Sequence, residues 1–418
     1  MNTNIFKSAI AALALLVAFN SCKKEETKFH IEVTCNPEHG TVTGTGDYAE
    51  GSKATIIATP NEGYCFVKWE GHTSTDSILI VNVSADKTYT AIFGKADIIQ
   101  KFPNGYMKTS ETIEGYTITY EAVPDENCYF LKWSNGEINP VIKTQEAITD
   151  LTPIFRQYPE GSIHALFSVG NGKRVIFSKG NLQFNPSLGT HTRADGTTAP
   201  GTWRFAETQT ERITDDSIVN ATYNGWIDDF AWGTSGWSGS GATYYQPYDG
   251  RFYENLITDE DSIASLFGPQ GECILTGEYA FADWGVYNPI SNGGNKPGMW
   301  RTINEDEFKY FINNSDYQDC ICYGYPYCYS FYAGNENSQI KHTMDFVELK
   351  KIIDADNRTV FFYYDDEHWS ESWGIWTANG GDESDAVIVD ARNSLKGWAY
   401  VFPRHSRQNV RLVMDVEE

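Results

Sequence analysis

Residues 224–247 read Asn-Gly-Trp-Ile-Asp-Asp-Phe-Ala-Trp-Gly-Thr-Ser-Gly-Trp-Ser-Gly-Ser-Gly-Ala-Thr-Tyr-Tyr-Gln-Pro, and the C-terminal part of the chain is organised around them. The three tryptophans are interspersed with glycines, which permit left-handed backbone and close packing. Such a segment cannot form a regular helix and is too rich in glycine for a plain strand. The pattern predicts a long ordered loop that is held by large aromatic anchors.

The composition favours a secreted, β-rich protein. The 418 residues allow about two to four domains. Lysine and arginine number 32 against 56 acidic residues, so the formal net charge is −24. This charge argues against nucleic acid as a partner and against electrostatic docking on anionic lipid. Aromatic residues make up 14% of the chain, with tyrosine the most frequent of them at 25, which predicts polar, aromatic surfaces.

The N-terminus has the pattern of a bacterial export signal. Lys7 precedes an apolar run, Ser8–Phe19, that suits a signal-peptide core and is too short to span a bilayer comfortably. The Phe-Asn-Ser-Cys that ends at Cys22 resembles the lipobox of Bacteroidota-type lipoproteins. The resemblance implies that residues 1–22 are the signal peptide and lipobox, and that Cys22 carries the lipid. The alternative is a plain secretory peptide with an incidental cysteine.

Residues 23–27 form a linker whose Lys-Lys-Glu-Glu is similar to the surface-export signal of such lipoproteins. The expected location is therefore the outer membrane, with the lipid anchor as the membrane partner and the protein facing outward.

A sequence repeat follows the linker. Residues 56–69 match residues 120–133 with a constant shift of 64 positions (133 − 69). The shared residues of the first copy are Ala58, Pro60, Glu62, Phe66, Lys68 and Trp69. A repeat of this length predicts one supersecondary unit that is used twice. Within the first unit, Ile31, Val33 and Cys35 alternate with polar residues, and Cys65, Val67 and Trp69 are predicted to face inward on a later strand.

The Pro-x-x-Gly-Tyr-x-Phe-x-x-Trp of the first copy resembles the divergent internalin-B-type B-repeat. The resemblance implies two small β modules, over residues 28–95 and 96–157, of a kind that forms stalks or spacers on bacterial surfaces and in some cases contributes to binding. Trp69 and Trp133 are expected in the module cores, because each lies on an alternating apolar face.

The eight cysteines include no strong metal motif. Removing Cys22 leaves an odd number, so at least one thiol is free or pairs between molecules. Cys35 and Cys65 lie on predicted inward faces and form a candidate disulfide. Cys320, Cys322 and Cys328 have neither zinc-like spacing nor a nearby histidine pair, which favours buried thiols or one disulfide there.

Residues 158–418 carry several strand and helix signals. A hairpin is predicted over residues 165–184, a helix from an N-cap at Thr302 to about Ile312, and a second helix over residues 344–353. Three strands are predicted near residues 387–389, 397–402 and 409–413.

A second resemblance is carried by six motifs of this region. They are Phe-Ser-Lys-Gly-Asn-Leu-Gln-Phe at 177–184, Trp-Arg-Phe-Ala at 203–206, Trp-Gly-Thr-Ser-Gly at 232–236, Asp-Trp-Gly at 283–285, Ser-Asn-Gly-Gly at 291–294 and Trp-Arg-Thr at 300–302. Together they resemble a domain of Bacteroidota surface lipoproteins. That domain is similar to the C-type-lectin-like fold shared with formylglycine-generating-enzyme-type domains and the major paralogous domain of Fibrobacter. The resemblance implies a mixed antiparallel sheet, two short helices and long surface loops.

The predicted fold class is therefore mainly β with an α+β C-terminal domain. Enzymes of the formylglycine-generating class use a late cysteine pair, and no cysteine follows Cys328, so we expect no catalytic residues and no enzyme. The acidic clusters at 228–229, 365–367 and 382–385 supply oxygen ligands suited to Ca²⁺, but none forms an EF-hand loop. We therefore expect these clusters to be solvated turns, and we expect no metal site and no cofactor.

The aromatic residues give the candidate ligand contacts, because exposed aromatic rings bind sugars and proteins efficiently. We predict Trp226 and Trp232 buried as loop anchors. The candidate ligand-binding residues are Trp237, Tyr244, Tyr245 and Trp376.

The leading hypothesis is a non-enzymatic surface lipoprotein, an adhesin or binding module for an extracellular glycan or protein. The alternatives are a structural or pilus-associated surface component and, less favoured, a formylglycine-generating-type enzyme.

Overall fold

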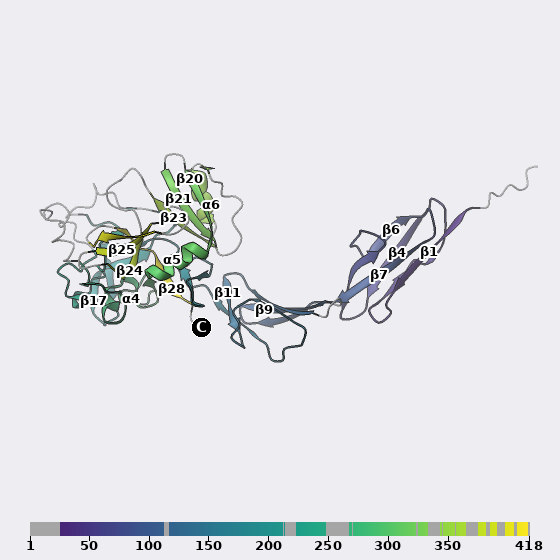
Figure 1. Cartoon of the computed structure of the whole chain (residues 1–418), viewed down its shortest axis with the longest axis horizontal. Helices are drawn as coiled ribbons and strands as arrows, with labels where there is room; N and C mark the ends of the chain where they lie inside the picture. The colour runs from purple at the N-terminus through teal and green to yellow at the C-terminus, as the bar shows by residue number, and fades with distance from the viewer. Residues whose placement is uncertain are drawn as a thin grey trace, which may run out of the picture. The chain divides into compact units, whose positions relative to one another are not determined.

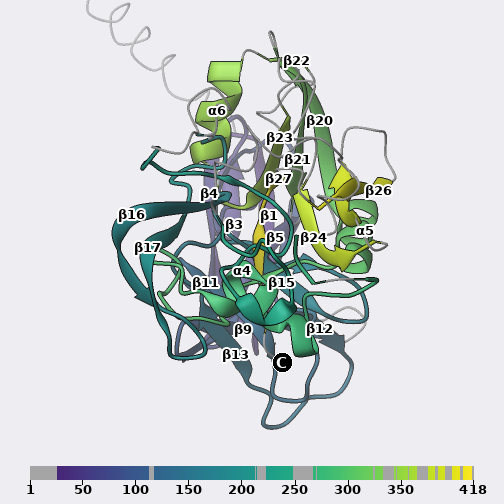
Figure 2. The same cartoon turned by 90° about the vertical axis from the view of Figure 1, so that its left-hand side faces the viewer.

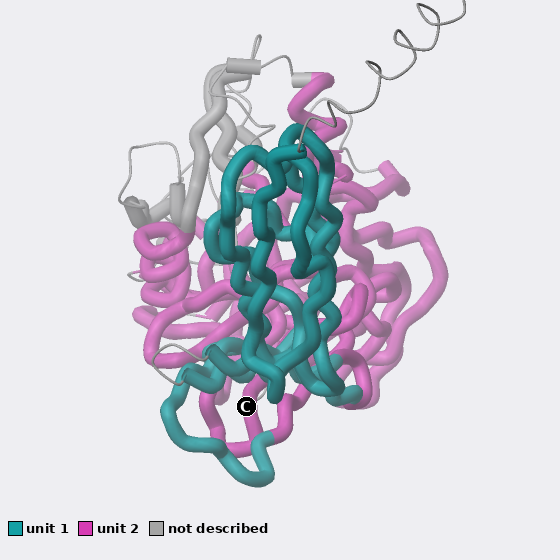
Figure 3. Tube along the Cα trace, turned by 90° about the vertical axis from the view of Figure 1, so that its right-hand side faces the viewer, with its two compact units in different colours: residues 1–101, 106–123, 139–151 teal, residues 102–105, 124–138, 152–418 magenta. Residues whose placement is uncertain are grey.

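The computed structural model describes most of the chain beyond its N-terminal segment. The described residues are 26–112, 117–211, 213, 223–247, 267–269, 271–322, 325–332, 343–344, 346–355, 357–364, 375–381, 385–390, 398–404 and 408–416. Strands make up 47% and helices 11% of the structure (Figure 1), which confirms the predicted mainly β fold class. The chain divides into two compact units (Figure 3), residues 1–101, 106–123 and 139–151, and residues 102–105, 124–138 and 152–418.

The first module is a pair of small sheets with one apolar core. Its strands are β1 Lys28–Cys35, β2 Gly40–Thr43, β3 Gly46–Ala49, β4 Lys53–Pro60, β5 Tyr64–Glu70, β6 Ile78–Asn82 and β7 Lys87–Lys95. They form one sheet in the order β3-β1-β7-β5 and another in the order β2-β4-β6. Alternate residues of both sheets are buried together, among them Ile31, Ile56 and Trp69, so the two inner faces pack on each other.

The side-chain alternation on β5 differs from the prediction at two positions. The register of β5 against β7 shifts between Phe66 and Lys68, which is a β-bulge. A bulge inserts one residue and reverses the side to which the following side chains point. Phe66 and Trp69 therefore both pack in the core, whereas Val67 is 45% exposed and Cys65 is exposed. The prediction that Cys65 and Val67 face inward was wrong for this reason.

The candidate disulfide between Cys35 and Cys65 was also wrong. Both cysteines are free thiols. The sequence pattern places them on neighbouring strands, but β7 lies between β1 and β5 and separates them. Cys35 pairs with Ala91 of β7 and Cys65 pairs with Gly94, so the two also differ in their level along that strand.

The second copy of the repeat has the same local geometry as the first. Its strands are β8 Ile98–Phe102, β9 Gly105–Thr112, β10 Thr117–Pro124, β11 Cys128–Trp133, β12 Val141–Thr144 and β13 Pro153–Gln157. The β11–β13 pair carries a bulge between Phe130 and Lys132, the counterpart of the bulge in β5. The ring centroids of Phe130 and Trp133 are 5.4 Å apart, as are those of Phe66 and Trp69. Trp133 is fully buried, as predicted.

The β11–β13 pair belongs to the same compact unit as the C-terminal region. Tyr129 and Leu131 of β11 pack with Ile176 and Val416 in one apolar cluster. The Arg174 guanidinium donates to the Leu131 carbonyl oxygen at 2.5 Å. The predicted module boundaries at residues 95 and 157 stay predictions.

The C-terminal region combines several small sheets with short helices. Its strands are β14 Phe167–Ser168, β15 Arg174–Phe177, β16 Leu182–Thr192, β17 Thr198–Phe205, β18 Asp229–Phe230, β19 Arg301–Thr302, β20 Asp316–Cys322, β21 Tyr325–Tyr332, β22 Thr343–Met344, β23 Thr359–Tyr364, β24 Ile375–Gly380, β25 Asp385–Asp390, β26 Trp398–Pro403, β27 Gln408–Asn409 and β28 Leu412–Asp415. Its helices are η1 Ser238–Ser240, η2 Gly277–Ala282, α4 Trp284–Tyr287, α5 Glu305–Asn314 and α6 Phe346–Ala355.

These strands form four sheets. Their orders are β14-β15-β28-β19, β16-β17, β18-β27-β24-β25-β26 and β22-β20-β21-β23. The long hairpin β16–β17 runs along one side of the region (Figure 2). β28, close to the C-terminus, pairs with both β15 and β19, so the end of the chain ties together segments that are distant in sequence.

Two apolar clusters fill the C-terminal region. One centres on the phenylalanines of β15, α5 and β23, including Phe177, Phe311 and Phe362. The other is built on five buried tryptophans from segments far apart in sequence. They are Trp203, Trp232, Trp284, Trp300 and Trp376.

The start of α5 differs from the prediction. Thr302 ends β19, and the N-cap of the helix is Asn304. The Asn304 side-chain oxygen accepts from the Glu307 backbone N–H at 2.9 Å, and the Glu307 carboxylate accepts from the Asn304 backbone N–H at 3.3 Å. This reciprocal capping box needs an acidic residue three positions after the cap, which Asn304 has in Glu307.

The sequence motifs that carry the second resemblance hold the tryptophan cluster together. The Asn292 side chain accepts from the Phe205 backbone N–H at 2.7 Å and donates to the Phe205 carbonyl at 2.9 Å. The Trp300 indole donates to the Gly293 carbonyl at 2.8 Å. A Cβ on Gly293 would lie only 2.6 Å from the Phe205 ring, so a larger residue does not fit there. These motifs therefore have a structural role.

Candidate functional site

The tryptophan- and glycine-rich loop is ordered and largely packed. Trp232 is fully buried, as predicted, and its indole donates to the Thr377 carbonyl at 3.0 Å. Trp376 is also fully buried, and its indole donates to the Phe230 carbonyl at 2.7 Å. Trp376 was predicted to be a ligand contact, but its ring lies in the tryptophan cluster with no face open to a ligand. This burial removes it from the candidates.

The other three candidate ligand residues are half-buried. The Trp237 ring packs edge-on against Phe281, with centroids 6.0 Å apart. Tyr244 lies beside Phe267 at 5.1 Å. The Tyr245 carbonyl accepts from the Gly236 backbone N–H at 2.8 Å. All three side chains are thus partly accessible, and the prediction that these residues contact a ligand stays a prediction.

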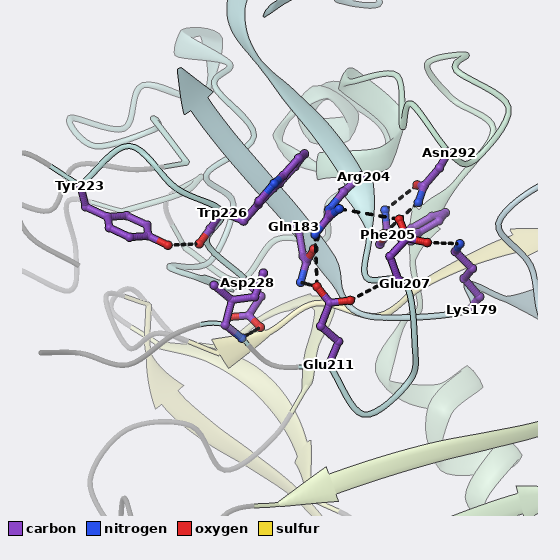
Figure 4. Close-up of polar contacts among 11 residues, drawn as sticks. Lys179, Gln183, Arg204, Phe205, Glu207, Glu211, Tyr223, Trp226, Asp228 and Asn292 are labelled. Atoms are coloured by element: carbon purple, nitrogen blue, oxygen red, sulfur yellow. Dashed lines mark hydrogen bonds and ion pairs between the residues drawn. The ribbon is translucent and has the colours of Figure 1, made fainter. Parts of the chain in front are cut away.

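Trp226 was predicted to be buried but is half-buried. Arg204 covers one face of its ring. The guanidinium carbon lies 4.1 Å from the ring centroid. Figure 4 shows the network that holds Arg204, which donates to Gln183 at 2.8 Å and to Glu211 at 3.1 Å. Glu207 is a third partner at 3.7 Å. The charge of Arg204 is therefore already neutralised within the protein.

A pocket of about 740 Å³ lies at the far end of the β16–β17 hairpin, beside the loop of residues 289–297. Backbone hydrogen bonds fix both walls. The Ser291 N–H donates to the Trp203 carbonyl at 2.9 Å, and the Ala194 N–H donates to the Tyr287 carbonyl at 2.9 Å. The residues that give the pocket its character are His191, Thr192, Arg193, Trp203, Asn295 and Lys296.

Arg193 is the central cation of this pocket. Its guanidinium lies over the Tyr287 ring at 5.2 Å. On its other side it approaches the tryptophan-rich loop, where a Cβ on Gly236 would lie 2.6 Å from Nη2. Gly236 has a φ of +94°, which glycine adopts readily. In the described part of the chain the buried Nε of Arg193 has no hydrogen-bond partner.

His191 forms a fixed wall of the pocket. Its Nδ1 lies 2.9 Å from the Gly201 carbonyl and its Nε2 lies 3.0 Å from the side-chain oxygen of Asn288. Asn288 is held in turn, because its amide group donates to the Ser235 carbonyl at 2.9 Å and to the Trp284 carbonyl at 3.1 Å. Burial lowers the pKa of His191, so its ring is neutral at pH 7.

The local charge of the pocket is positive, against the strongly negative chain. Arg193 and Lys296 line it, and no carboxylate is among the lining residues in the described ranges. Asp195 is the nearby acid, but its carboxylate accepts from the Tyr287 hydroxyl at 2.8 Å and from the Thr197 hydroxyl at 2.6 Å. These hydrogen bonds, those of Thr197 first, and the nearby charge of Arg193 lower the pKa of Asp195 and keep it ionised.

A second pocket, of about 610 Å³, is lined by charges of both signs, with Lys173 and Arg301 beside Asp283, Glu307 and Asp415. Its Arg301 donates to Glu307 at 2.7 Å and to Asp415 at 2.6 Å. Its buried Asp283 accepts backbone N–H groups of Gly285 at 3.0 Å and Thr302 at 2.7 Å. Arg301 and Asp283 therefore serve the fold, and the acidic residues distinguish this pocket from the first.

No metal site or catalytic constellation emerges from the described residues. Among them there is no group of three His, Cys, Asp or Glu residues placed to hold a metal ion. The predicted solvated turn at Asp228–Asp229 is in fact buried, with Asp228 accepting from the Ile213 N–H at 2.8 Å and Asp229 accepting from the Asn409 amide at 2.8 Å.

Several sequence-based predictions lie outside the described residues. Cys22 and residues 365–367 are among them, as are the side chains of Cys320, Cys322 and Cys328. No helix in the described ranges is both long and apolar enough to cross a membrane.

Comparison with known proteins identifies one domain. A family model described as "Divergent InlB B-repeat domain" matches residues 31–97. The chain therefore contains one divergent InlB B-repeat domain, close to the range predicted for the first module, and such a domain suggests a surface repeat protein. No curated protein and no solved structure matches the chain. None of these comparisons gives evidence for a lectin-like or formylglycine-generating-enzyme-like C-terminal domain.

Proposed function

We propose that this chain is a lipid-anchored protein of the outer cell surface whose C-terminal region binds an extracellular glycan or protein without catalysis. The observation that carries the proposal is the B-repeat domain at residues 31–97, a kind of domain that suggests a surface repeat protein. The lipobox-like sequence at Cys22 supports a lipid anchor, and the net charge of −24 disfavours nucleic acid as a partner.

The second module is proposed to be a further B-repeat. The equivalent bulges in β5 and β11 support this assignment, since the register shift falls at Phe66–Lys68 in one copy and at Phe130–Lys132 in the other. Bulges at equivalent positions are retained features of a fold rather than accidents.

The C-terminal region is proposed to have a C-type-lectin-like fold. In support, the motifs that resemble that class meet in one cluster, where Asn292 holds Phe205 and Gly293 accepts from Trp300. We propose that the region is not an enzyme, because no cysteine follows Cys328 and the late cysteine pair of the formylglycine-generating class is therefore missing.

The proposal is tested in two steps. Mass spectrometry of the mature protein from membranes should find a diacylated cysteine at Cys22. A glycan array and a panel of extracellular proteins, probed with the chain that lacks residues 1–22, should find a specific ligand. A soluble protein with unmodified Cys22, or binding to no probe in either panel, would contradict the proposal.

A structural role is the second candidate function, and an apolar stripe on the B-repeat domain favours it. Ile57 pairs with Ile78 across β4 and β6, and Ile80 follows on the same face. Ile78 is 57% exposed and Ile80 is 61% exposed. Adjacent exposed isoleucines on one sheet face are a feature of protein interaction sites. An Ile78→Lys/Ile80→Lys variant that no longer assembles with surface partners, while ligand binding persists, would support this candidate.

A further inference from the structure

We infer that the pocket around Arg193 binds the carboxylate of an acidic saccharide, such as a uronic acid unit. The inference rests on the proposed function and adds to that function a class of ligand and the place where the ligand binds. The pocket is of the size that holds small ligands in proteins, roughly 300–1,000 Å³. Its volume of about 740 Å³ leaves room for a short oligosaccharide.

The two cationic side chains that line the pocket, Arg193 and Lys296, favour an anionic ligand. In the described part of the chain, two residues that line the pocket each have a buried donor without a hydrogen-bond partner, Nε of Arg193 and Nε1 of Trp203. Their unmet hydrogen-bonding capacity leaves the lining electropositive, and an anion compensates it through its charge rather than by contact with these two buried atoms. Lys296, on the loop of residues 289–297, adds a second positive charge to the lining.

Comparison with the other stacked arginines singles out Arg193. Arg204 lies over Trp226 but donates to Gln183 and Glu211. Arg404 lies over Trp232 and donates to backbone carbonyls, including that of Gly271 at 2.7 Å. Arg193 lies over Tyr287 and its charge acts on Asp195, but no hydrogen bond of its guanidinium is found among the described residues. A planar guanidinium held by an aromatic ring presents its fork to a carboxylate in bidentate geometry.

The rest of the pocket suits the hydroxyl groups of a sugar. Exposed hydroxyl and amide side chains line it at Thr190, Thr192, Ser291 and Asn295. These groups both donate and accept hydrogen bonds, as sugar hydroxyls do. Saccharide binding through polar groups beside a fixed cation therefore matches the pocket better than an apolar ligand would.

The tryptophan-rich loop shapes the cation site. Gly236 gives Arg193 its space, because any Cβ there would collide with Nη2 at 2.6 Å. The next residue, Trp237, contacts Phe281, whose ring lies 5.2 Å from that of Tyr287. An aromatic row thus leads from the predicted ligand contact Trp237 to the ring under Arg193.

The test uses the chain without residues 1–22 and three matched trisaccharides. Trigalacturonic acid carries carboxylates, a galactose trisaccharide lacks them, and a sulfated galactose trisaccharide carries a different anion. Titration calorimetry should show binding of trigalacturonic acid and at least about tenfold weaker binding of the neutral sugar.

Arg193→Ala and Lys296→Ala should each weaken the binding of trigalacturonic acid at least about tenfold. The affinity of Arg193→Lys should fall between those of Arg193→Ala and the native chain, because lysine keeps the charge without the fork of donors. Lys351→Ala, an exposed charge on α6, is the control for net charge and should bind as the native chain does.

Each outcome has one meaning once circular dichroism shows that the variants are folded. Carboxylate-selective binding that depends on Arg193 supports the inference. Preference for the sulfated sugar, or binding of any ligand that Arg193→Ala leaves unchanged, overturns the inference while the proposed function stands. Absence of binding to every saccharide and protein probe overturns both.

Discussion

Replacing Asp283 tests how the fold holds α4, whose last residue, Tyr287, lies under Arg193. Asp283 is fully buried and is the N-cap of α4, where its Oδ1 accepts from the N–H groups of Gly285 at 3.0 Å and Val286 at 3.4 Å. Its Oδ2 accepts from the Thr302 N–H at 2.7 Å, which ties α4 to β19. Burial raises the pKa of Asp283 and these hydrogen bonds oppose the rise.

The magnitude follows from the donors that the substitution leaves without a partner. Asp283→Ala leaves two well-placed buried N–H groups and one weaker one, at about 1–3 kcal/mol for each buried unpaired donor. The expected loss of unfolding free energy is about 3–5 kcal/mol. Asp283→Asn keeps one carbonyl oxygen for the cap and turns an N–H₂ group toward a donor, so we expect about 2 kcal/mol.

Urea unfolding followed by tryptophan fluorescence measures the change, since Trp284 adjoins the substituted residue. Native-state hydrogen exchange adds a local measurement that does not depend on two-state unfolding of the whole chain. The amides of Gly285 and Thr302 should exchange much faster in the variant. A loss below about 1 kcal/mol with unchanged exchange would refute the claim that Asp283 ties these two elements together.

Three further predictions concern the first module, one histidine and the tryptophan-rich loop. Trp69→Ala should lower the unfolding free energy by about 3–5 kcal/mol in urea titration, whereas Val67→Ala, at the bulge and 45% exposed, should change it by less than about 0.5 kcal/mol; equal losses would contradict the bulge. Burial lowers the pKa of His164 below 6.5, and Asn357 donates to its Nδ1 at 2.8 Å. The unfolded chain therefore binds the proton first, so stability is full above pH 6.5 and falls as pH drops toward the folded pKa, which NMR titration should find below 6.5. Gly236→Ala, at a φ of +94°, should cost about 1 kcal/mol or more in thermal unfolding and displace the pocket arginine; an unchanged midpoint would contradict this.

The sequence predicts the first module well because its core follows simple alternation. Ile31 and Ile56 are buried where the period of two places them. The prediction fails where a bulge breaks the period, and the pattern of Cys65 and Val67 contains no signal for the extra residue. A local sequence pattern does not contain the strand order either. The position of β7 between β1 and β5 was therefore not predicted, and the Cys35–Cys65 disulfide was predicted in error.

The candidate pocket could not be predicted, for a related reason. Its parts come from a hairpin turn at Arg193, a loop at Lys296 and a strand at Trp203, and only the last lies in a recognisable motif. Sequence reasoning selected aromatic residues by type and included Trp376, whose burial depends on contacts with β18 that lie far away in sequence. One available signal was Gly236, since a glycine within a tryptophan-rich loop indicates a close approach by another group.

Binding to intact cells tests the central claim most directly. Cells that express the chain and cells that lack it are incubated with a labelled ligand found on the arrays, before and after brief surface proteolysis. We predict chain-dependent binding that proteolysis abolishes, together with release of C-terminal fragments into the medium. A chain that stays intact on protease-treated cells, or binding equal in cells with and without it, would contradict a surface-displayed binding protein.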